Sequence, residues 1–354
     1  MADEAYINLA IRRQAILERL KSGEVSNFAV GIKKIEKLIR SAIFELEGEF
    51  GKLSRVKLNN LLALLQQDQG EIFKAATASF LERSADIAAV YMAQEILDLK
   101  NTVDVRGTKL NDFTKKDIFK KVIQRPLSTD GDLLQPWIKK FSDREISRVS
   151  NSIRLGHSQG LTNQEMVQKL VGTKARKFQD GLLQTTRRNA ETVVRTSVQH
   201  VASAARQEVW EANPDVVKRY KFLATLDRTT SPICRTLDKQ EFDFGQGPIP
   251  PVHPNCRSTT TPVLDPKFSF LSKGRTRSGE QGPVSADTTY YEWLKRQDKA
   301  AQSAVLGPKR AKLFQDGGLT AERFRALQFD KNFTPLTLDG MRKLEPEAFK
   351  KAGL

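Results

Sequence analysis

The chain has 354 residues, of which 39% are hydrophobic and 28% charged, so it can form two or three domains with a sizeable buried core. No stretch approaches the roughly 20 apolar residues of a membrane-spanning helix, and residues 1–13 lack the apolar segment and cleavage site of a signal peptide. These features exclude a helical membrane protein, and we expect folding in a cytoplasm and no membrane partner.

The balance of charge is the strongest signal in the composition. The 58 lysines and arginines exceed the 42 aspartates and glutamates by 16, which favours polyanionic partners because each neutralised phosphate releases a counterion. The basic residues form short clusters: Lys33, Lys34 and Lys37; Lys115, Lys116, Lys120 and Lys121; Lys139 and Lys140; Arg187 and Arg188; Arg275 and Arg277; Lys309, Arg310 and Lys312. Scattered clusters suit contacts to a nucleic-acid backbone without base readout. The alternative is a soluble surface that happens to be basic.

The first 110 residues have a helical pattern. Apolar residues recur in steps of three and four at Phe28, Ile32, Ile35, Ile39, Ala42, Leu46 and Phe50, and residues 75–99 form a second apolar stretch without proline. We expect antiparallel helices that each bury one stripe, although such a stripe could instead dock a partner helix. A break at residues 101–112 predicts a linker.

Shorter helices are expected next. Thr114 with Asp117, Ser142 with Glu145, and Thr162 with Glu165 resemble helix starts, and the last two pairs are predicted capping boxes. A long helix is expected over residues 187–213. Its inner face is small, with Ala190, Val194, Ser197, Val201 and Ala204, so that another element can approach closely.

The apolar period then changes to two. Alternation over residues 220–226 predicts a strand, residues 240–242 and 258–263 are two further strand candidates, and Ser231 with Pro232 predicts a short helix that holds Cys234. Residues 245–257 contain too many prolines to pair in a sheet. Residues 111–272 are therefore expected to form an α+β domain, with the long helix packed on a small antiparallel sheet.

The remainder divides into a linker and a tail. Residues 273–287 are rich in glycine, serine and arginine and predict a flexible linker. Residues 288–354 are expected to form short helices, with starts marked near Tyr290, Pro308, Thr320 and Thr337. The expected fold class is mainly α with a small α+β domain.

Five motifs occur in order in the central region. They are Ala190-Glu-Thr-Val-Val-Arg-Thr196, Leu226-Asp-Arg-Thr229, Cys234-Arg-Thr-Leu-Asp238, Gln240-Glu-Phe242 and Pro251-Val-His-Pro-Asn-Cys-Arg257. Over residues 130–264 the chain resembles the phage head morphogenesis family, the minor head proteins of the phage Mu F type. One departure is Lys239, where the family often has glycine, which suggests a different turn. Residues 1–110 carry no motif of this family, and the tail resembles an extension that many members have.

The resemblance implies a structural minor head protein of a tailed phage, without enzymatic activity. It implies assembly with the portal protein and the major capsid protein, placement in the capsid interior of the virion near the portal, and packaging in few copies. The basic charge adds double-stranded DNA as a partner, bound without sequence preference. The N-terminal helices or the tail are the expected portal-binding parts, because short amphipathic helices dock readily between subunits.

The second signal in the motifs is the spacing of Cys234, His253 and Cys256, which is C-x18-H-x2-C. Two thiolates and an imidazole suit zinc, and Asp227 is the first candidate for a fourth ligand, with Asp238 and His200 as others. A disulfide and plain packing are the alternatives. In all three cases the side chains would tie the proline-rich loop to the helix of Cys234, so we expect them to lie in contact.

The same motifs contain four arginines, Arg195, Arg228, Arg235 and Arg257. We expect at least one of them to pair with Asp227 or Asp238 inside the domain, while the others could touch DNA or a neighbouring subunit.

Two other classes of function remain open. His253 and Asn255 beside Cys256 resemble fragments of a metal-dependent nuclease, which needs a second histidine; His157 and His200 lie far upstream. Such a DNA-processing enzyme of the phage head is the alternative. A nucleic-acid-binding protein of the host would fit the charge but not the motifs. Neighbouring portal and terminase genes would separate these hypotheses.

Overall fold

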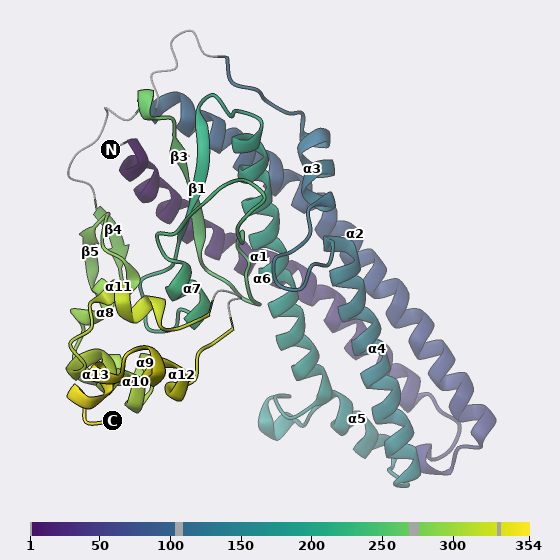
Figure 1. Ribbon diagram of the computed structural model, residues 1–354. Helices are drawn as coiled ribbons and strands as arrows, with labels where there is room; N and C mark the ends of the chain where they lie inside the picture. Colours follow the sequence, from purple (N-terminus) through teal and green to yellow (C-terminus); the bar gives the residue numbers. More distant parts are fainter. Residues whose placement is uncertain (1, 103–108, 269–275, 331–333) are drawn as a thin grey trace.

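The computed structural model describes residues 2–102, 109–268, 276–330 and 334–354 (Figure 1). The fold is mainly helical with a small antiparallel sheet, as the sequence predicts. The helices up to the sheet are α1 (Ala2–Phe44), α2 (Arg55–Thr102), α3 (Lys115–Gln124), α4 (Leu134–Ser158), α5 (Asn163–Val171) and α6 (Leu182–Glu211). Short 3-10 turns lie at Phe50–Lys52, Lys174–Arg176 and Pro266–Phe268.

The strands and the remaining helices follow α6. The strands are β1 (Val217–Leu223), β2 (Glu241–Phe242), β3 (Thr259–Leu264), β4 (Thr276–Gly279) and β5 (Gly282–Ser285). The helices are α7 (Pro232–Leu237), α8 (Tyr290–Lys295), α9 (Lys299–Leu306), α10 (Pro308–Asp316), α11 (Ala321–Ala326), α12 (Leu338–Leu344) and α13 (Pro346–Lys351). In the part of the chain that is described, no helix has a stretch apolar and long enough to cross a bilayer.

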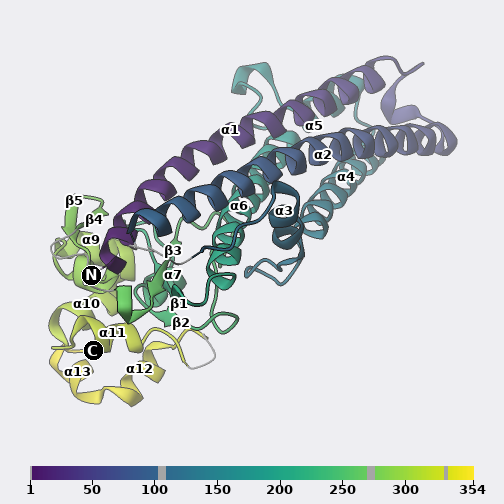
Figure 2. The ribbon, with the colours of Figure 1, turned by 90° about the horizontal axis from the view of Figure 1, so that it is seen from above.

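Helices α1 and α2 form a long antiparallel hairpin. Figures 1 and 2 show that the loop between them lies with α4 and α5 at one end of the molecule, while the sheet and the tail lie at the other. The predicted stripe is buried along α1 up to Ile39, with Ile35 and Ile39 at most 1% exposed, whereas Leu46 and Phe50 lie beyond the end of the helix at Phe44. Helix α2 begins twenty residues before the predicted stretch at residue 75, and its first half buries Leu58, Leu61, Leu62 and Leu65, which have a helical spacing that the prediction did not include. We call this hairpin the arm.

Helix α6 is the centre of the fold. All five small residues of its predicted inner face are buried, and α1, α2, α3 and α4 pack around it. Buried ion-pair contacts add to this packing: Arg206 donates to Glu95 of α2 at 2.8 Å and to the carbonyl of Thr260 in β3 at 2.8 Å, and Trp210 donates to the same glutamate at 2.7 Å. The hydrophobic core that results runs from Tyr6 to Phe268. This core includes residues on both sides of the predicted boundary at residue 110. A separately folding region of residues 1–110 stays a prediction.

Strands β1, β2 and β3 form the expected antiparallel sheet in the order β2-β1-β3. Tyr220 lies opposite Phe242 on one side and opposite Pro262 on the other. The predicted starts at Thr114, Thr162 and Ser231 are confirmed, since each side chain accepts a hydrogen bond from a backbone N–H of the first turn.

The predicted capping box at Ser142 is wrong. Both of its residues lie inside α4, where Ser142 donates to the carbonyl of Ile138. Glu145 is buried and accepts hydrogen bonds from Thr186 and Asn189 of α6, each at 2.8 Å. The buried position of Glu145 is therefore explained by its contact with α6, and not by the start of a helix.

Residues 276–285 differ from the expected flexible linker, whose residues 273–275 lie outside the described part of the chain. They form the hairpin of β4 and β5. The reason is Arg277, whose side chain is fully buried and pairs with the equally buried Asp238, both nitrogens at 3.0 Å. A sequence rich in glycine and arginine conceals this buried ion pair.

The tail forms the short helices that the sequence predicts, together with α9 and α13, which it does not. Thr289, Thr320 and Thr337 cap α8, α11 and α12. Aromatic and aliphatic side chains of the tail form a second hydrophobic cluster around Tyr291 and Phe314, to which the central region contributes Leu226. The tail thus has a packed core of its own beside the sheet.

Candidate metal centre

Two elements present the predicted cysteine and histidine side chains. Helix α7 starts at Pro232, and its cap Ser231 accepts a hydrogen bond from the N–H of Cys234 at 3.3 Å, which fixes the first turn. The proline-rich loop before β3 presents His253 and Cys256. Between them Asn255 has a φ of +59°, a left-handed conformation that asparagine tolerates well.

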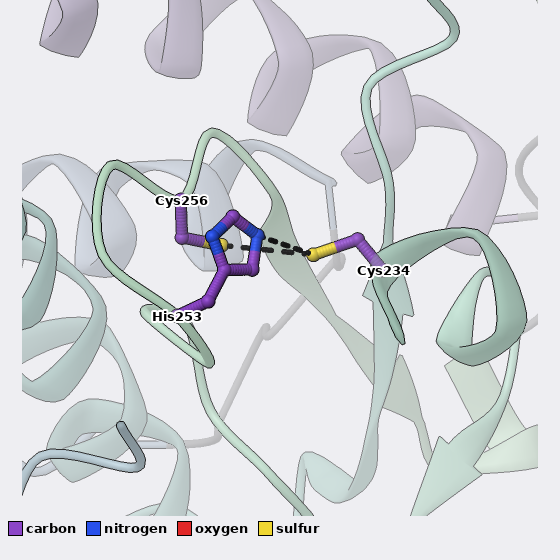
Figure 3. A group of neighbouring side chains, drawn as sticks. All are labelled: Cys234, His253 and Cys256. Atoms are coloured by element: carbon purple, nitrogen blue, oxygen red, sulfur yellow. Dashed lines mark hydrogen bonds between the residues drawn. The ribbon is translucent and has the colours of Figure 1, made fainter. Parts of the chain in front are cut away.

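The three side chains converge, as expected (Figure 3). The Sγ atom of Cys234 lies 3.3 Å from Nε2 of His253 and 3.8 Å from Sγ of Cys256. All three potential ligand atoms lie within 4.8 Å of one another. Both cysteines are free and buried, so the disulfide alternative is not formed in this structure. The other ring nitrogen of His253, Nδ1, lies 2.8 Å from the carbonyl oxygen of Pro254.

Hydrogen bonds within the cluster shift the pKa values of all three side chains. Burial raises the pKa of Cys256, but hydrogen bonds from Cys234 and His253 outweigh burial and hold that pKa well below its ordinary value. The Cys234 pKa is raised, because this thiol is hydrogen-bonded to the Cys256 sulfur and is buried. The hydrogen bond to Cys256 also raises the pKa of His253. A thiolate at Cys256 is thus stabilised by two neighbouring donors.

A small polar cavity adjoins the cluster. It has a volume of about 40 Å³, and Cys234 and His253 form part of its wall. Hydroxyl groups dominate the rest of the lining, from Thr225, Thr229, Thr230, Ser231 and Ser258, together with Asn255 and Arg257. A cavity of this size and polarity can hold ordered water.

The proposed fourth ligands lie elsewhere. Asp227 is held by Arg257, with 2.7 Å between Nη1 and Oδ2, and Thr229 and Thr230 also donate to it. Asp238 pairs with Arg277. His200 is buried in α6, with Nε2 at 3.3 Å from the carbonyl of Val122. Asp227 therefore does not join the cluster, because its charge is already satisfied by an arginine and two hydroxyls.

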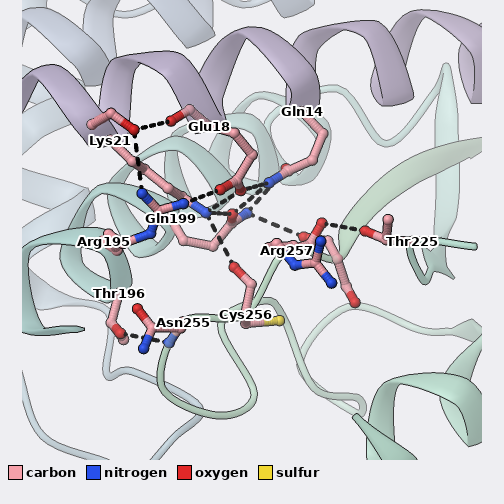
Figure 4. A network of polar contacts seen from close by, with 12 residues as sticks. Gln14, Glu18, Lys21, Arg195, Thr196, Gln199, Thr225, Asn255, Cys256 and Arg257 are labelled. Carbon is pink, nitrogen blue, oxygen red and sulfur yellow. Dashed lines mark hydrogen bonds and ion pairs between the residues drawn. The ribbon is translucent and has the colours of Figure 1, made fainter. Parts of the chain in front are cut away.

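The proline-rich loop is held by side chains from distant parts of the chain (Figure 4). Lys21 of α1 donates to the carbonyl of Cys256 at 3.1 Å, and Gln199 of α6 donates to the carbonyl of Ser258 at 3.2 Å. Thr196 accepts from the N–H of Asn255 at 3.1 Å. These contacts satisfy two carbonyls and one amide at the end of the loop without a sheet partner, and so help to hold a segment that its prolines exclude from a sheet.

Lys21 is the centre of this network. Its ammonium is 1% exposed and also donates to Oε1 of Gln199 at 2.7 Å and to Glu18 at 2.6 Å. Burial lowers its pKa, and the Glu18 carboxylate opposes that effect. Gln14 donates to Gln199 from the same helix at 2.8 Å. Sequence reasoning missed these α1 residues, because nothing in a helical segment without motifs indicates that it reaches a loop more than 200 residues away.

The comparison with known families concerns the central part of the chain. Residues 147–261 match the family described as phage Mu protein F like protein. The matched residues make up about a third of the chain, so the similarity concerns its central segment. The match begins within α4 and ends within β3. It therefore includes α6, β1, β2 and the cluster of Cys234, His253 and Cys256. It supports the phage head morphogenesis family that the motifs indicate. No curated protein and no solved structure matches the chain.

Within the Mu F-like segment the four motif arginines all have intramolecular partners. Arg257 pairs with Asp227, which confirms the expected internal pair. Arg195 pairs with Glu18 at 2.6 Å and Arg228 with Glu280 at 3.4 Å, while Arg235 donates to the carbonyls of Thr230 and Val305. These arginines join the Mu F-like segment to the arm, the hairpin and the tail.

The departure at Lys239 has a clear position in the Mu F-like segment. Its φ is +65°, in the left-handed region that glycine adopts without strain. Lys239 thus adopts a backbone conformation that suits glycine better than it suits lysine. The N–H of Lys239 donates to the carbonyl of Phe222 at 2.8 Å, which anchors the turn between α7 and β2.

The histidines of the chain lie apart. His157 is on α4, with Nε2 at 2.9 Å from the carbonyl of Leu53, and His200 faces α3. Within the described residues the metal-type cluster contains His253 as its one histidine. This arrangement differs from the paired histidines that a nuclease of the His-Asn-His kind needs.

Proposed function

We propose that the protein is a structural minor head protein of a tailed phage, placed in the capsid interior next to the portal, where it contacts packaged DNA without sequence specificity. The observation that carries the proposal is the Mu F-like segment at residues 147–261. The family is one of head morphogenesis, and this coarser role does not depend on the details that follow. In this proposal the protein has no catalytic role, and it is made in the host cytoplasm before packaging.

The arm is the part that we propose for contact with the portal. Six large apolar side chains on it are more than half exposed: Ile16, Val30, Phe44, Val56, Leu64 and Leu97. Among the described residues of the tail Leu344 is similarly exposed, and most of the aromatic side chains are buried in the tail's own cluster. A pair of long helices with exposed apolar residues can dock between the subunits of a ring.

The proposed DNA contact rests on where the positive charge lies. Residues 1–110 carry 16 basic and 15 acidic side chains and are nearly neutral, whereas residues 111–272 carry 26 basic and 17 acidic ones. Residues 288–354 carry 13 basic and 8 acidic ones. The surplus therefore lies in the central region and the tail. Lys116 and Lys120 are exposed one turn apart on α3 and belong to this surplus.

The DNA contact is tested by measuring affinity for two unrelated duplexes over a range of salt concentrations. We expect similar affinities for both duplexes and a steep loss of affinity with salt. Exchange of Lys116 and Lys120 for alanine should weaken binding to both and reduce the slope of log K against log salt by up to about two.

The matched control exchanges two exposed lysines of the arm, Lys57 and Lys74, which lie 3.8 Å from Glu47 and 3.7 Å from Glu71. It removes the same charge, and we expect unchanged binding. Salt-independent binding, strong preference for one duplex, or equal loss in both double variants would contradict the proposed contact.

A further inference from the structure

We propose that Cys234, His253 and Cys256 bind one zinc ion, with a water molecule from the adjoining cavity as the fourth ligand. The inference concerns how the Mu F-like segment is held together, and it does not rest on the proposed role in the head. Two thiolates and an imidazole are a donor set that zinc prefers over the hard cations calcium and magnesium.

The distances between the donor atoms fit a shared ion. Two sulfurs bound to zinc at about 2.3 Å in a tetrahedron lie about 3.8 Å apart. The two Sγ atoms here are 3.8 Å apart, and His253 Nε2 is 3.3 Å from the sulfur of Cys234. A disulfide would need the sulfurs at about 2.05 Å, so one of them would have to move by almost 2 Å.

The surroundings orient the donors as in known zinc sites. His253 Nδ1 faces the carbonyl of Pro254 at 2.8 Å and donates to it, so Nε2, which faces the cluster, is the nitrogen that would release its proton and bind the ion. Ser231 fixes the turn of Cys234, and Lys21 fixes the carbonyl of Cys256. The ligands are therefore already positioned by α1, α7 and the loop.

The fourth coordination position of the zinc suits a water molecule rather than a substrate. The cavity of about 40 Å³ beside Cys234 and His253 is lined by hydroxyls that can hydrogen-bond a metal-bound water. It has room for little more than water. Asp227, the nearest acid in the motif, pairs with Arg257 and is therefore not a free base. The ion would thus act as a tie between the proline-rich loop and α7, in keeping with a structural role.

The test uses the full chain, purified without a chelator from cells grown with zinc. We expect about one zinc per chain, and after exchange with cobalt(II) the visible absorption bands of a tetrahedral thiolate site. Added imidazole should shift these bands by replacing the water. Removal of the ion should lower the midpoint of thermal unfolding by at least about 5 °C.

Two variants and one control complete the test. Cys256→Ser and His253→Asn should each retain less than a tenth of the zinc, whereas His157→Gln, a histidine on α4, should retain all of it. Since the variants could fail to fold, circular dichroism accompanies each measurement. The cobalt spectrum of the unaltered chain tests the site without any variant.

Less than a tenth of a zinc per chain together with no cobalt bands would overturn the site. So would a disulfide found as the absence of free thiols in the denatured, unreduced chain. Cobalt bands that imidazole leaves unchanged would overturn the water ligand. Full zinc content in both variants would place the ion elsewhere.

Discussion

Exchange of Asp238 for asparagine tests the buried ion pair that anchors the hairpin and the tail. Its carboxylate is fully buried and accepts hydrogen bonds from four donors. They are the two Nη atoms of Arg277, at 3.0 Å each, the N–H of Ala224 at 2.8 Å and the N–H of Tyr290 at 2.7 Å. The exchange keeps the shape of the side chain, removes its charge and turns one acceptor into a donor.

The expected loss follows from these contacts. The charge of Arg277 would remain buried without a counter-ion, and loss of one partner of a buried ion pair costs about 3–5 kcal/mol. One of the two side-chain oxygens becomes an NH₂ group that faces two donors, and each donor left unsatisfied costs about 1–3 kcal/mol, which gives a similar range. We therefore expect Asp238→Asn to lower the free energy of unfolding by about 3–5 kcal/mol.

Urea unfolding followed by circular dichroism measures this loss, and limited proteolysis shows whether the tail is released. The matched control is Glu280→Gln, which breaks the exposed pair with Arg228 in the same hairpin and should cost less than about 1 kcal/mol. A loss at Asp238 no larger than that at Glu280, with the tail still protected, would show that the buried ion pair does not anchor the tail.

Three further predictions concern stability. Burial lowers the pKa of His200 to about 4, below its unfolded value of about 6.5, so the unfolded chain binds the proton first and stability falls as pH falls through that window. Between pH 7 and pH 5 the free energy of unfolding should fall by about 2 kcal/mol more than it does in His200→Asn. Equal pH profiles of the two proteins in urea unfolding would contradict this prediction. Lys239→Gly should stabilise the chain by about 1 kcal/mol by relieving the left-handed backbone, whereas glycine at Gln240 should not; an unchanged melting temperature would count against strain at this position. Lys21→Met should cost about 2 kcal/mol, because buried acceptors lose their donor, against less than about 0.5 kcal/mol for the exposed Lys74→Met; equal losses in chemical denaturation would exclude Lys21 as an anchor of the loop.

The sequence predicts those features of the fold that depend on neighbouring residues. Helix starts at Thr162 and Ser231 follow from their side chains. A strand follows from the alternation at residues 220–226, although β1 begins and ends three residues earlier, at Val217 and Leu223. The contact between Cys234 and Cys256 was also predictable, because the proline-rich loop between them needs an attachment and few other side chains could supply it.

Features that depend on distant contacts were not predictable. Arg277 looked solvated among glycines and serines, although Asp238 draws it into the core. Ser142 looked like a cap, because the buried partners of Glu145 come from α6. Lys21 lies in a stretch without motifs and reaches the loop only because α1 packs along α6. Each of these residues is polar, and its partner is decided by packing.

The most direct test of the central claim is to look for the chain in purified virions and in isolated procapsids, by mass spectrometry and with an antibody. A minor head protein should be present in few copies in both particles. Exchange of the exposed side chains Phe44, Val56 and Leu64 of the arm for serine should remove the chain from the particles while the fold is retained. Absence of the intact chain from both particles would contradict a structural role in the head and would favour the enzyme alternative.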